Sequence, residues 1–278
     1  MKTLISLILL LSAVTAKSQH YYNDIVSNNE LINRIKTLVD NKVKSITATG
    51  FDPQGAKTAD YNEWQEIDAD NNMLKVTTRN GQQVTRQFYR FDKQFRVISV
   101  IDSSTDIKSL TAYNYENNNL VSIKTTVNDT LQGLSQSEEH QWKYNSSGKP
   151  VKMWRIVNNT DSNEYRFTLD EKGNITDEKQ YRRNYAIDSI LYYYDESNRL
   201  TDIVRYDKKA RRLLPDFMFE YDDNSRVIQK ITTLSAANPN YLIWRYLFNE
   251  KGLKTKEALF NKQKEVQGRI EYTFTFSQ

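Results

Sequence analysis

The chain has 278 residues, of which 38% are hydrophobic and 12% aromatic, and it contains 18 tyrosines but no cysteine. This composition allows a packed domain rich in residues that favour β-sheet. The lack of cysteine excludes disulfides, a thiol nucleophile and a cysteine-linked lipid anchor. The formal net charge is +4, and it falls to +2 without Lys2 and Lys17, so the sequence predicts no general attraction to nucleic acid or to an anionic membrane.

The first residues have the pattern of an export signal. Lys2 precedes an apolar run from Leu4 to Leu11, and Val14-Thr15-Ala16 is a small-residue cleavage site, with a second possible cut after Ser18. The run is shorter than the roughly 20 residues of a membrane-spanning helix. We therefore predict a signal peptide over residues 1–18 and an exported chain without a transmembrane helix, located in the periplasm, on the cell surface or outside the cell.

Residues 19–63 form the next predicted region, an N-terminal helix and a lead-in strand region. Ser27-Asn28-Asn29-Glu30 resembles a helix capping box, and the apolar residues after it recur at helical spacing. We predict one short helix that covers an edge of a sheet or plugs it, because a free edge strand promotes aggregation. FDPQGAK (51–57) is interpreted as an extra turn. The apolar stripe of the helix consists of Leu31, Ile32, Ile35, Leu38 and Val39.

Residues 64–278 contain about eight copies of one unit, spaced 24 to 29 residues apart. Each copy has an aromatic, any residue, a second aromatic, an Asp or Asn, two polar residues, Gly or Asn, a polar residue and an aliphatic one. The two aromatics point to one face of a strand, and the Asp or Asn can accept bonds from the amides of a hairpin turn. The clearest copies are YRFDKQFRV (89–97), YNYENNNLV (113–121), WKYNSSGKPV (142–151), FTLDEKGNI (167–175), YYYDESNRL (192–200), FEYDDNSRV (219–227) and YLFNEKGLK (246–254).

Two strands per copy give about sixteen strands, whereas an open twisted sheet rarely exceeds roughly 10. The predicted fold is therefore all-β: an antiparallel meander of about eight tandem hairpins, wrapped into a large curved sheet, a spiral or a barrel, with one short N-terminal helix. The aromatics of the unit are predicted to share one buried face.

Catalytic and metal signals are weak. Glu138, Glu139 and His140 are consecutive, so on a strand they would point to alternating faces. DADNN (68–72) begins like a calcium loop, but Arg79 occupies the position of the expected bidentate Glu. Acidic pairs suited to a glycosidase cannot be identified from spacing alone. We predict no cofactor, no metal site and no catalytic residue.

One basic cluster is a candidate binding surface. Consecutive hairpins place equivalent loops about 10 Å apart, within about one Debye length. Two such loops are rich in Lys and Arg, so we predict that they form one patch for an acidic partner. The alternative is a row of solvated loops that only aids solubility. The patch comprises Arg182, Arg183, Lys208, Lys209, Arg211 and Arg212.

The repeated unit resembles the YD repeat of RHS and teneurin-type proteins, most clearly in YYYDESNRL and FEYDDNSRV. The resemblance covers roughly residues 64–276, and the short secreted YD-repeat proteins of Bacteroidetes-like bacteria are the most similar group. It implies an extracellular β-meander shell and, in some members, carbohydrate binding or adhesion. The Asp is replaced by Glu116, Asn145 and Asn249, and the Arg-Leu pair is complete only at Arg199-Leu200.

The sequence therefore favours a non-enzymatic envelope or secreted module that binds an anionic glycan or another surface protein. One alternative is an outer-membrane β-barrel, since alternating aromatic and polar faces also suit a lipid-facing wall. NITDEKQY (174–181) opposes it, because Asp177 and Lys179 charge one face of the strand and Glu178 the other. A carboxylate-dependent glycoside hydrolase is a second alternative.

Overall fold

The computed structural model describes residues 20–104, 107–208, 210–235 and 238–277, so the predicted signal peptide lies outside the described residues. The described residues form one helix and 18 strands. They are α1 (Asn23–Asp40), β1 (Val43–Phe51), β2 (Lys57–Asp68), β3 (Met73–Asn80), β4 (Gln83–Phe91), β5 (Val97–Ser103), β6 (Ile107–Glu116), β7 (Asn119–Asp129), β8 (Leu134–Tyr144), β9 (Pro150–Val157), β10 (Asp161–Leu169), β11 (Ile175–Arg182), β12 (Tyr185–Tyr194), β13 (Leu200–Asp207), β14 (Arg212–Tyr221), β15 (Val227–Ser235), β16 (Asn238–Phe248), β17 (Lys254–Phe260) and β18 (Val266–Phe276).

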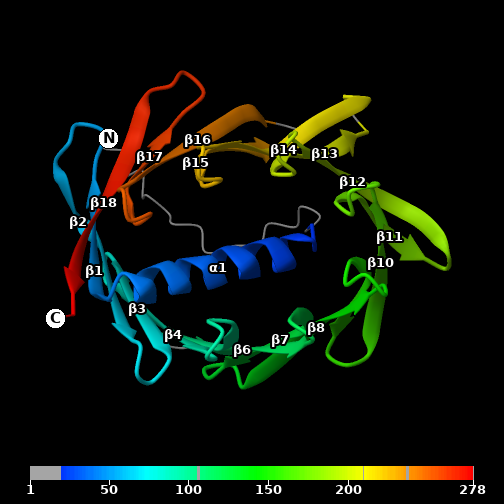
Figure 1. Ribbon diagram of the computed structural model, residues 1–278, viewed down its shortest axis with the longest axis horizontal. Helices are drawn as coiled ribbons and strands as arrows, with labels where there is room; N and C mark the ends of the chain where they lie inside the picture. The colour runs from blue at the N-terminus through cyan, green and yellow to red at the C-terminus, as the bar shows by residue number, and fades with distance from the viewer. Residues whose placement is uncertain (1–19, 105–106, 209, 236–237, 278) are drawn as a thin grey trace.

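The sheet closes on itself into a barrel. Each strand pairs antiparallel with the next along the chain, and β1 pairs with both β2 and β18. Figure 1 shows the resulting ring, with β1, β2 and β18 side by side. The prediction of a large wrapped all-β sheet is confirmed, and among the predicted shapes the structure is the barrel and not a spiral. Residues 43–63, expected to be a lead-in, supply β1 and part of β2, which close the barrel.

The end of the barrel that carries the turns after even-numbered strands is called the turn rim. In six of these turns the side-chain oxygen of an Asp or Asn accepts a bond from the N–H four residues later, as between Asp195 and Arg199 (2.9 Å). In all six turns the residue before that N–H has a left-handed backbone conformation, with positive φ. This includes the non-glycine residues Phe95 (φ 64°) and Asn198 (φ 61°). The predicted turn chemistry is confirmed. Glu116 differs, because Asn117 and Asn118 form a two-residue turn in which both have positive φ.

The aromatics of the unit face the barrel interior. Tyr192 pairs with Ile203, and the two are 2% exposed, whereas the neighbouring Tyr193 faces outward and is 45% exposed. The tyrosine just before the acid also binds the preceding copy. Tyr115 Oη donates to the carbonyl of Val97 (2.9 Å), and Tyr144 and Tyr221 make the equivalent bond. The shared inward face predicted from the repeat is present, and it links each hairpin to the one before it.

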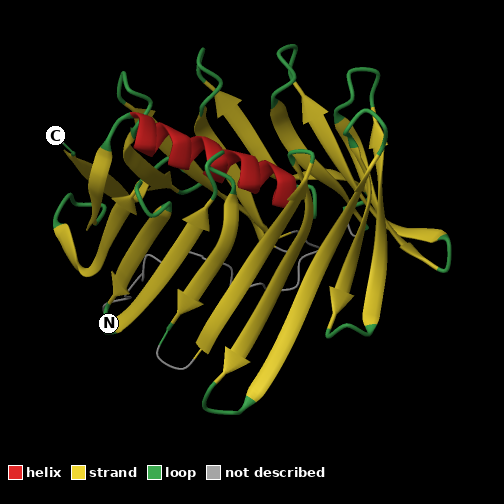
Figure 2. Ribbon diagram, turned by 60° about the horizontal axis from the view of Figure 1, so that its bottom comes forward, coloured by secondary structure: helices red, strands yellow, loops and turns green. Residues whose placement is uncertain are grey.

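Helix α1 lies across the interior at the turn rim (Figures 1 and 2). Ile35 packs with Leu74, Phe91 and Val97 on the wall, and Asn41 Nδ2 donates to the carbonyl of Lys251 (3.3 Å) in a turn. An 18-stranded barrel is too wide for its own side chains to fill. The helix therefore acts as a plug at this end, which was one of its two predicted roles.

The predicted helix start is wrong by one turn. The helix begins at Asn23, and Ser27 to Glu30 lie within it, so they form no capping box. Tyr22 occupies the N-cap position without a side-chain cap. The backbone N–H groups of Tyr21 and Tyr22 instead bond to Glu178 on β11. The carboxylate of Glu178, which is distant in sequence, thus accepts N–H bonds at the start of the helix, as the capping box was expected to do.

Candidate functional site

Inward-facing side chains change from buried to exposed along the barrel. Near helix α1, Trp142 is 6% exposed and Ile190 3%. Further along β8, the inward-facing Gln136 is exposed, and Val127, which pairs with it, is 36% exposed. The interior is therefore closed around the helix and open to solvent toward the opposite end, called the loop rim. This plugged interior is the candidate site.

One wall of the interior, on β4 to β7, carries a row of hydrogen-bonding groups. Tyr89 Oη donates to Gln87 Oε1 (2.8 Å), and Gln87 Nε2 donates to Asp102 Oδ2 (2.7 Å). Further along, the hydroxyls of Thr111 and Thr125 are 3.0 Å apart. Their placement follows from the period of two, since Gln87 and Thr111 share a face with the inward aromatics of their strands, and Asp102 and Thr125 are their partners across the sheet. Such hydroxyl, amide and carboxylate groups suit a ligand with many hydroxyls.

An ion network joins the start of the helix to β8 and β9. His140 Nδ1 lies 2.7 Å from Asp24 Oδ2, and its Nε2 lies 2.8 Å from Glu138 Oε1. Arg155 pairs with the other oxygen of Glu138. Burial alone would lower the pKa of His140, but the bonds to the two carboxylates raise it to about 9. The His140 bond, with Arg155, lowers the pKa of Glu138 to about 2. The cluster therefore holds a charged His140 between two carboxylates.

Glu178 anchors the segment that precedes the helix. It is 2% exposed and accepts bonds from the N–H groups of Tyr21 (2.9 Å) and Tyr22 (3.0 Å) and from Tyr192 Oη (2.6 Å). Burial raises its pKa to about 7, although these donors act in the opposite direction. With so little exposed surface the carboxyl group cannot reach a substrate, so its role here is to hold the plug.

Sequence reasoning missed this interior network. It placed Glu178 on the face opposite Asp177 and Lys179, which is correct, since Glu178 pairs with Phe167 and Ile190 inside. The signal available was a single acid in a row of inward apolar residues. Glu138 and His140 likewise face inward, and Glu139 faces outward near Lys124 (3.8 Å).

No group of three or more His, Cys, Asp or Glu residues placed to hold a metal ion occurs in the described parts of the chain. The three acidic and histidine residues at 138–140 are divided between two faces. Asp68, the first residue of the calcium-like stretch, accepts bonds from the N–H (3.0 Å) and side-chain amide (2.8 Å) of Asn71. That stretch is a turn between β2 and β3.

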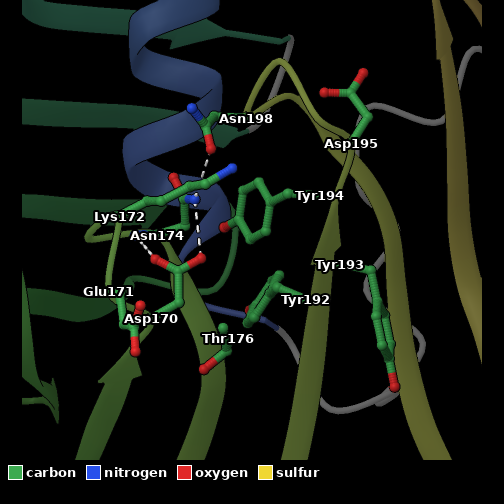
Figure 3. A pocket seen from close by; sticks show the side chains of 10 residues that line it. All are labelled: Asp170, Glu171, Lys172, Asn174, Thr176, Tyr192, Tyr193, Tyr194, Asp195 and Asn198. Carbon is green, nitrogen blue, oxygen red and sulfur yellow. Dashed lines mark hydrogen bonds between the residues drawn. The ribbon is translucent and has the colours of Figure 1, made fainter.

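A surface pocket of about 420 Å³ lies at the turn rim, between the turns after β10 and β12 (Figure 3). Its polar groups are used within the turns: Asn174 donates to Asp170 (3.0 Å) and to Asn198 (3.2 Å). In Figure 3, Tyr193 points away from Tyr192 and Tyr194. The pocket is therefore formed by two successive turns whose polar groups bond to one another.

The predicted basic patch is only partly described. Arg182, Arg183, Lys208, Arg211 and Arg212 are exposed, and none of these five has an ion-pair partner among the described residues. They belong to the connections after β11 and β13, which both lie at the loop rim. Lys209 lies outside the described residues. Whether the two loops act together stays a prediction.

No helix among the described residues is long and apolar enough to cross a membrane. The outer face of the barrel carries charged residues in the middle of its strands. Many of them pair across neighbouring strands or along one strand. These pairs are Lys75–Glu66, Lys124–Glu139, Lys152–Glu164, Arg166–Glu164, Lys179–Asp177, Lys256–Glu271 and Arg269–Glu271.

No protein-family model matches the chain, and no curated protein matches it. Among solved structures, a porin-like protein from Bacteroides uniformis is similar over 84% of this chain and 98% of its own, with 9% identity and a TM-score of 0.43. A Tc holotoxin pore from Photorhabdus luminescens matches 77% of this chain and 16% of its own, with 10% identity and a TM-score of 0.31.

A DUF1329 family protein from Desulfovibrio piger is similar over 91% of this chain and 93% of its own, with 9% identity and a TM-score of 0.24. These identities and TM-scores are low. The assignment of the fold therefore rests on the strand pairing of the chain itself, which closes from β18 to β1.

Proposed function

We propose that this protein is an exported, non-catalytic binding module that holds a polar ligand inside a plugged β-barrel. The proposal rests on the inward-facing side chains, which are buried near helix α1 and exposed to solvent toward the loop rim. A plug at one end and a solvent-accessible, polar wall toward the other make a cup, and ligand sites are typically concave with a few directed polar groups. The resemblance to YD-repeat proteins is consistent with a carbohydrate as the ligand.

The wall of this barrel faces water in our proposal. A Lys or Arg on a lipid-facing wall costs roughly 2 to 4 kcal/mol at the bilayer midplane. Lys124, Lys179 and Lys256 all lie near the middle of outward strand faces, each close to a carboxylate. Surface pairs of this kind suit an aqueous interface, where they contribute little to stability and much to solubility.

The outer-membrane β-barrel is the second candidate function. Closure of an even number of antiparallel strands favours it, because only a sheet without edges can satisfy its backbone in lipid. Carbonate extraction of the membrane fraction separates the two candidates. We expect the protein in the soluble fraction without detergent, and retention in the carbonate-washed pellet would favour the membrane barrel.

Ligand binding inside the barrel can be tested by cysteine labelling, because the natural chain has no cysteine. Gln136→Cys places a thiol on the inward face of β8, and Ser137→Cys places one on the outward face beside it. A ligand bound inside should slow maleimide labelling at position 136 and leave position 137 unchanged. Equal protection at both positions, or at neither, would contradict the proposal.

A further inference from the structure

Lys230 on β15 is a cation enclosed by the barrel without an acidic partner. It pairs inward with Phe219 on one side and Trp244 on the other. Its Nζ lies 4.8 Å from the centre of the Phe217 ring and 5.9 Å from that of Phe219. Among the described residues no carboxylate lies within ion-pair distance of it. Burial lowers the pKa of Lys230, with Glu30 acting in the opposite direction.

An enclosed ammonium group that lacks a paired anion is unusual, because a buried charge is normally paired or hydrogen-bonded. The rings of Phe217 and Phe219 offset part of the loss of hydration through cation–π contact, worth about 0.5 to 2 kcal/mol. The two rings offer no conventional hydrogen-bond acceptor. The N–H donors of Lys230 therefore have no acceptor among the described residues of the barrel wall and can bond to a ligand.

Glu30 on helix α1 is an acid whose charge acts on Lys230. Its side chain is exposed to solvent. The surrounding barrel residues still restrict the water around it, which raises the pKa of Glu30, and the charge of Lys230 lowers it. The helix thus contributes an exposed carboxylate and the wall an ammonium group, and no ion pair joins the two among the described residues.

His20 and Arg205 complete the surroundings of Lys230. The His20 ring lies edge-on to Phe217 with the centroids 5.2 Å apart, and its buried Nδ1 has no hydrogen-bond partner in the described structure. Burial, with Lys230 and Arg205 nearby, lowers the pKa of His20 to about 4, so the ring is neutral at neutral pH. Arg205 is held by Asp216 at 2.7 Å.

We propose that the inner wall of β14–β16 around Lys230 binds an acidic sugar, with its carboxylate on Lys230. The proposal rests on the interior-binding function proposed above and names its ligand class. The sugar ring would lie against Phe217 and Phe219, since aromatic faces accept the apolar C–H face of a pyranose. His20 Nδ1 and Glu30 are positioned to bond to hydroxyls. A charge-assisted bond from Lys230 would select the acidic sugar over the neutral one.

The test is isothermal titration calorimetry with two probes, a trigalacturonate and the neutral galactotriose of equal length. Wild-type protein should bind the acidic probe, and more weakly as salt rises. Lys230→Met should reduce its affinity by at least about tenfold, as expected for loss of a charged hydrogen bond, whereas Lys230→Arg should retain most of it. Lys143→Met, on the outward face of β8, is the matched control and should bind like wild type.

Circular dichroism and thermal melting establish that each variant is folded. If Lys230→Met and Lys143→Met both bind the trigalacturonate as tightly as wild type does, the site at Lys230 is wrong. Ligand binding elsewhere in the interior would not be contradicted. Equal affinity for the acidic and neutral probes would also overturn the role of Lys230. If no soluble glycan or other polar ligand protects Gln136→Cys from labelling, the proposed function itself fails.

Discussion

Glu178 on β11 accepts a 2.9 Å hydrogen bond from the backbone N–H of Tyr21, a residue 157 positions earlier in the chain. The bond fixes the start of the plug to the barrel wall. With the partner bonds from Tyr22 and Tyr192, one carboxylate satisfies three donors inside the barrel. The start of helix α1 is therefore anchored by a single side chain on a strand in the middle of the sheet.

Glu178→Gln should destabilise the protein by about 1 to 3 kcal/mol. The amide NH2 of Gln would face the N–H and O–H groups that now bond to the carboxylate and would leave some of them without an acceptor. Urea unfolding followed by tyrosine fluorescence measures the change. Glu139→Gln is the matched control, because Glu139 faces outward near Lys124 and should alter stability by less than about 0.5 kcal/mol. Equal midpoints for the two variants would mean that apolar packing alone holds the plug.

Stability should fall as pH rises from 5 to 9. The pKa of Glu178 is about 7 in the folded protein, above its ordinary 4.5, so its contribution is lost between these values. The pKa of His140 is about 9 instead of 6.5, so its contribution is present below 6.5 and lost as pH approaches 9. Each tenfold difference in proton affinity is worth about 1.4 kcal/mol, so the loss is at most about 3 kcal/mol for each group and about 7 kcal/mol for the two together.

The same network predicts a second decline in acid. Glu138 has a pKa of about 2, below its ordinary 4.5, so its contribution is present above 4.5 and lost as pH falls. Urea midpoints from pH 3 to 10 should therefore pass through a maximum near pH 5. In His140→Gln the decline between pH 7 and 9 should be shallower, and an unchanged slope would remove His140 from the explanation.

Tyr192 and Tyr193 provide an internal comparison of the two faces. Tyr192→Ala empties a site beside Ile190 and Ile203 and should cost about 3 to 5 kcal/mol. Tyr193→Ala, on the outer face of the same strand, should cost less than about 1 kcal/mol. Thermal melting of both variants measures the difference. The reverse order would mean that the barrel presents its other face to the interior.

The repeat predicted the strands and their faces because both depend on local chemistry. A period of two fixes which aromatics share a face, and the turn residues Asp195 and Asn198 fix where the chain reverses. Closure could not be predicted in this way. An open spiral and a barrel have the same pattern in every copy, and the pairing of β1 with β18 joins strands more than 200 residues apart, such as Ala48 with Tyr272.

The interior site was beyond prediction for the same reason. Glu178 could be assigned to the inward face, but its partners Tyr21 and Tyr22 precede the repeat and their bonds require the closed barrel. The local capping box at Ser27 was a misleading signal. It has the right residue types, but the turn before it is already held in helical form by contacts with β11 and β12.

The arginine of the turn unit should be more important than its place in a surface turn suggests. Arg226 donates to Asp222 within its turn (2.7 Å), stacks 4.9 Å from the Phe248 ring and reaches the carbonyl of Asn249 in the next turn (3.4 Å). Lysine cannot make these contacts together. Arg226→Lys should lower stability by about 1 kcal/mol, whereas Arg211→Lys in an exposed loop should have no measurable effect. Equal unfolding midpoints would contradict a role in linking turns.

The basic residues at the loop rim give the last prediction, which concerns capture of an anionic glycan before it enters the barrel. The five described members of the patch are exposed and have no acidic partners among the described residues, whereas Asp207 accepts a bond from Ala210 in its own loop (2.7 Å). Because the net charge is small, attraction must come from this local cluster and weaken with salt. Changing positions 208, 209, 211 and 212 to Gln should reduce the association rate with immobilised polygalacturonate at low salt by about tenfold.

The control removes an equal charge at the turn rim, through Gln at the exposed Lys93, Lys143, Lys172 and Lys251, and should associate like wild type. Surface plasmon resonance separates the two steps of binding. Loss of the patch should slow association and leave dissociation nearly unchanged, because a rim charge acts on encounter, whereas Lys230→Met should speed dissociation, because a buried bond acts on the formed complex. A quadruple loop variant that associates at the wild-type rate would identify these residues as a solvated loop row.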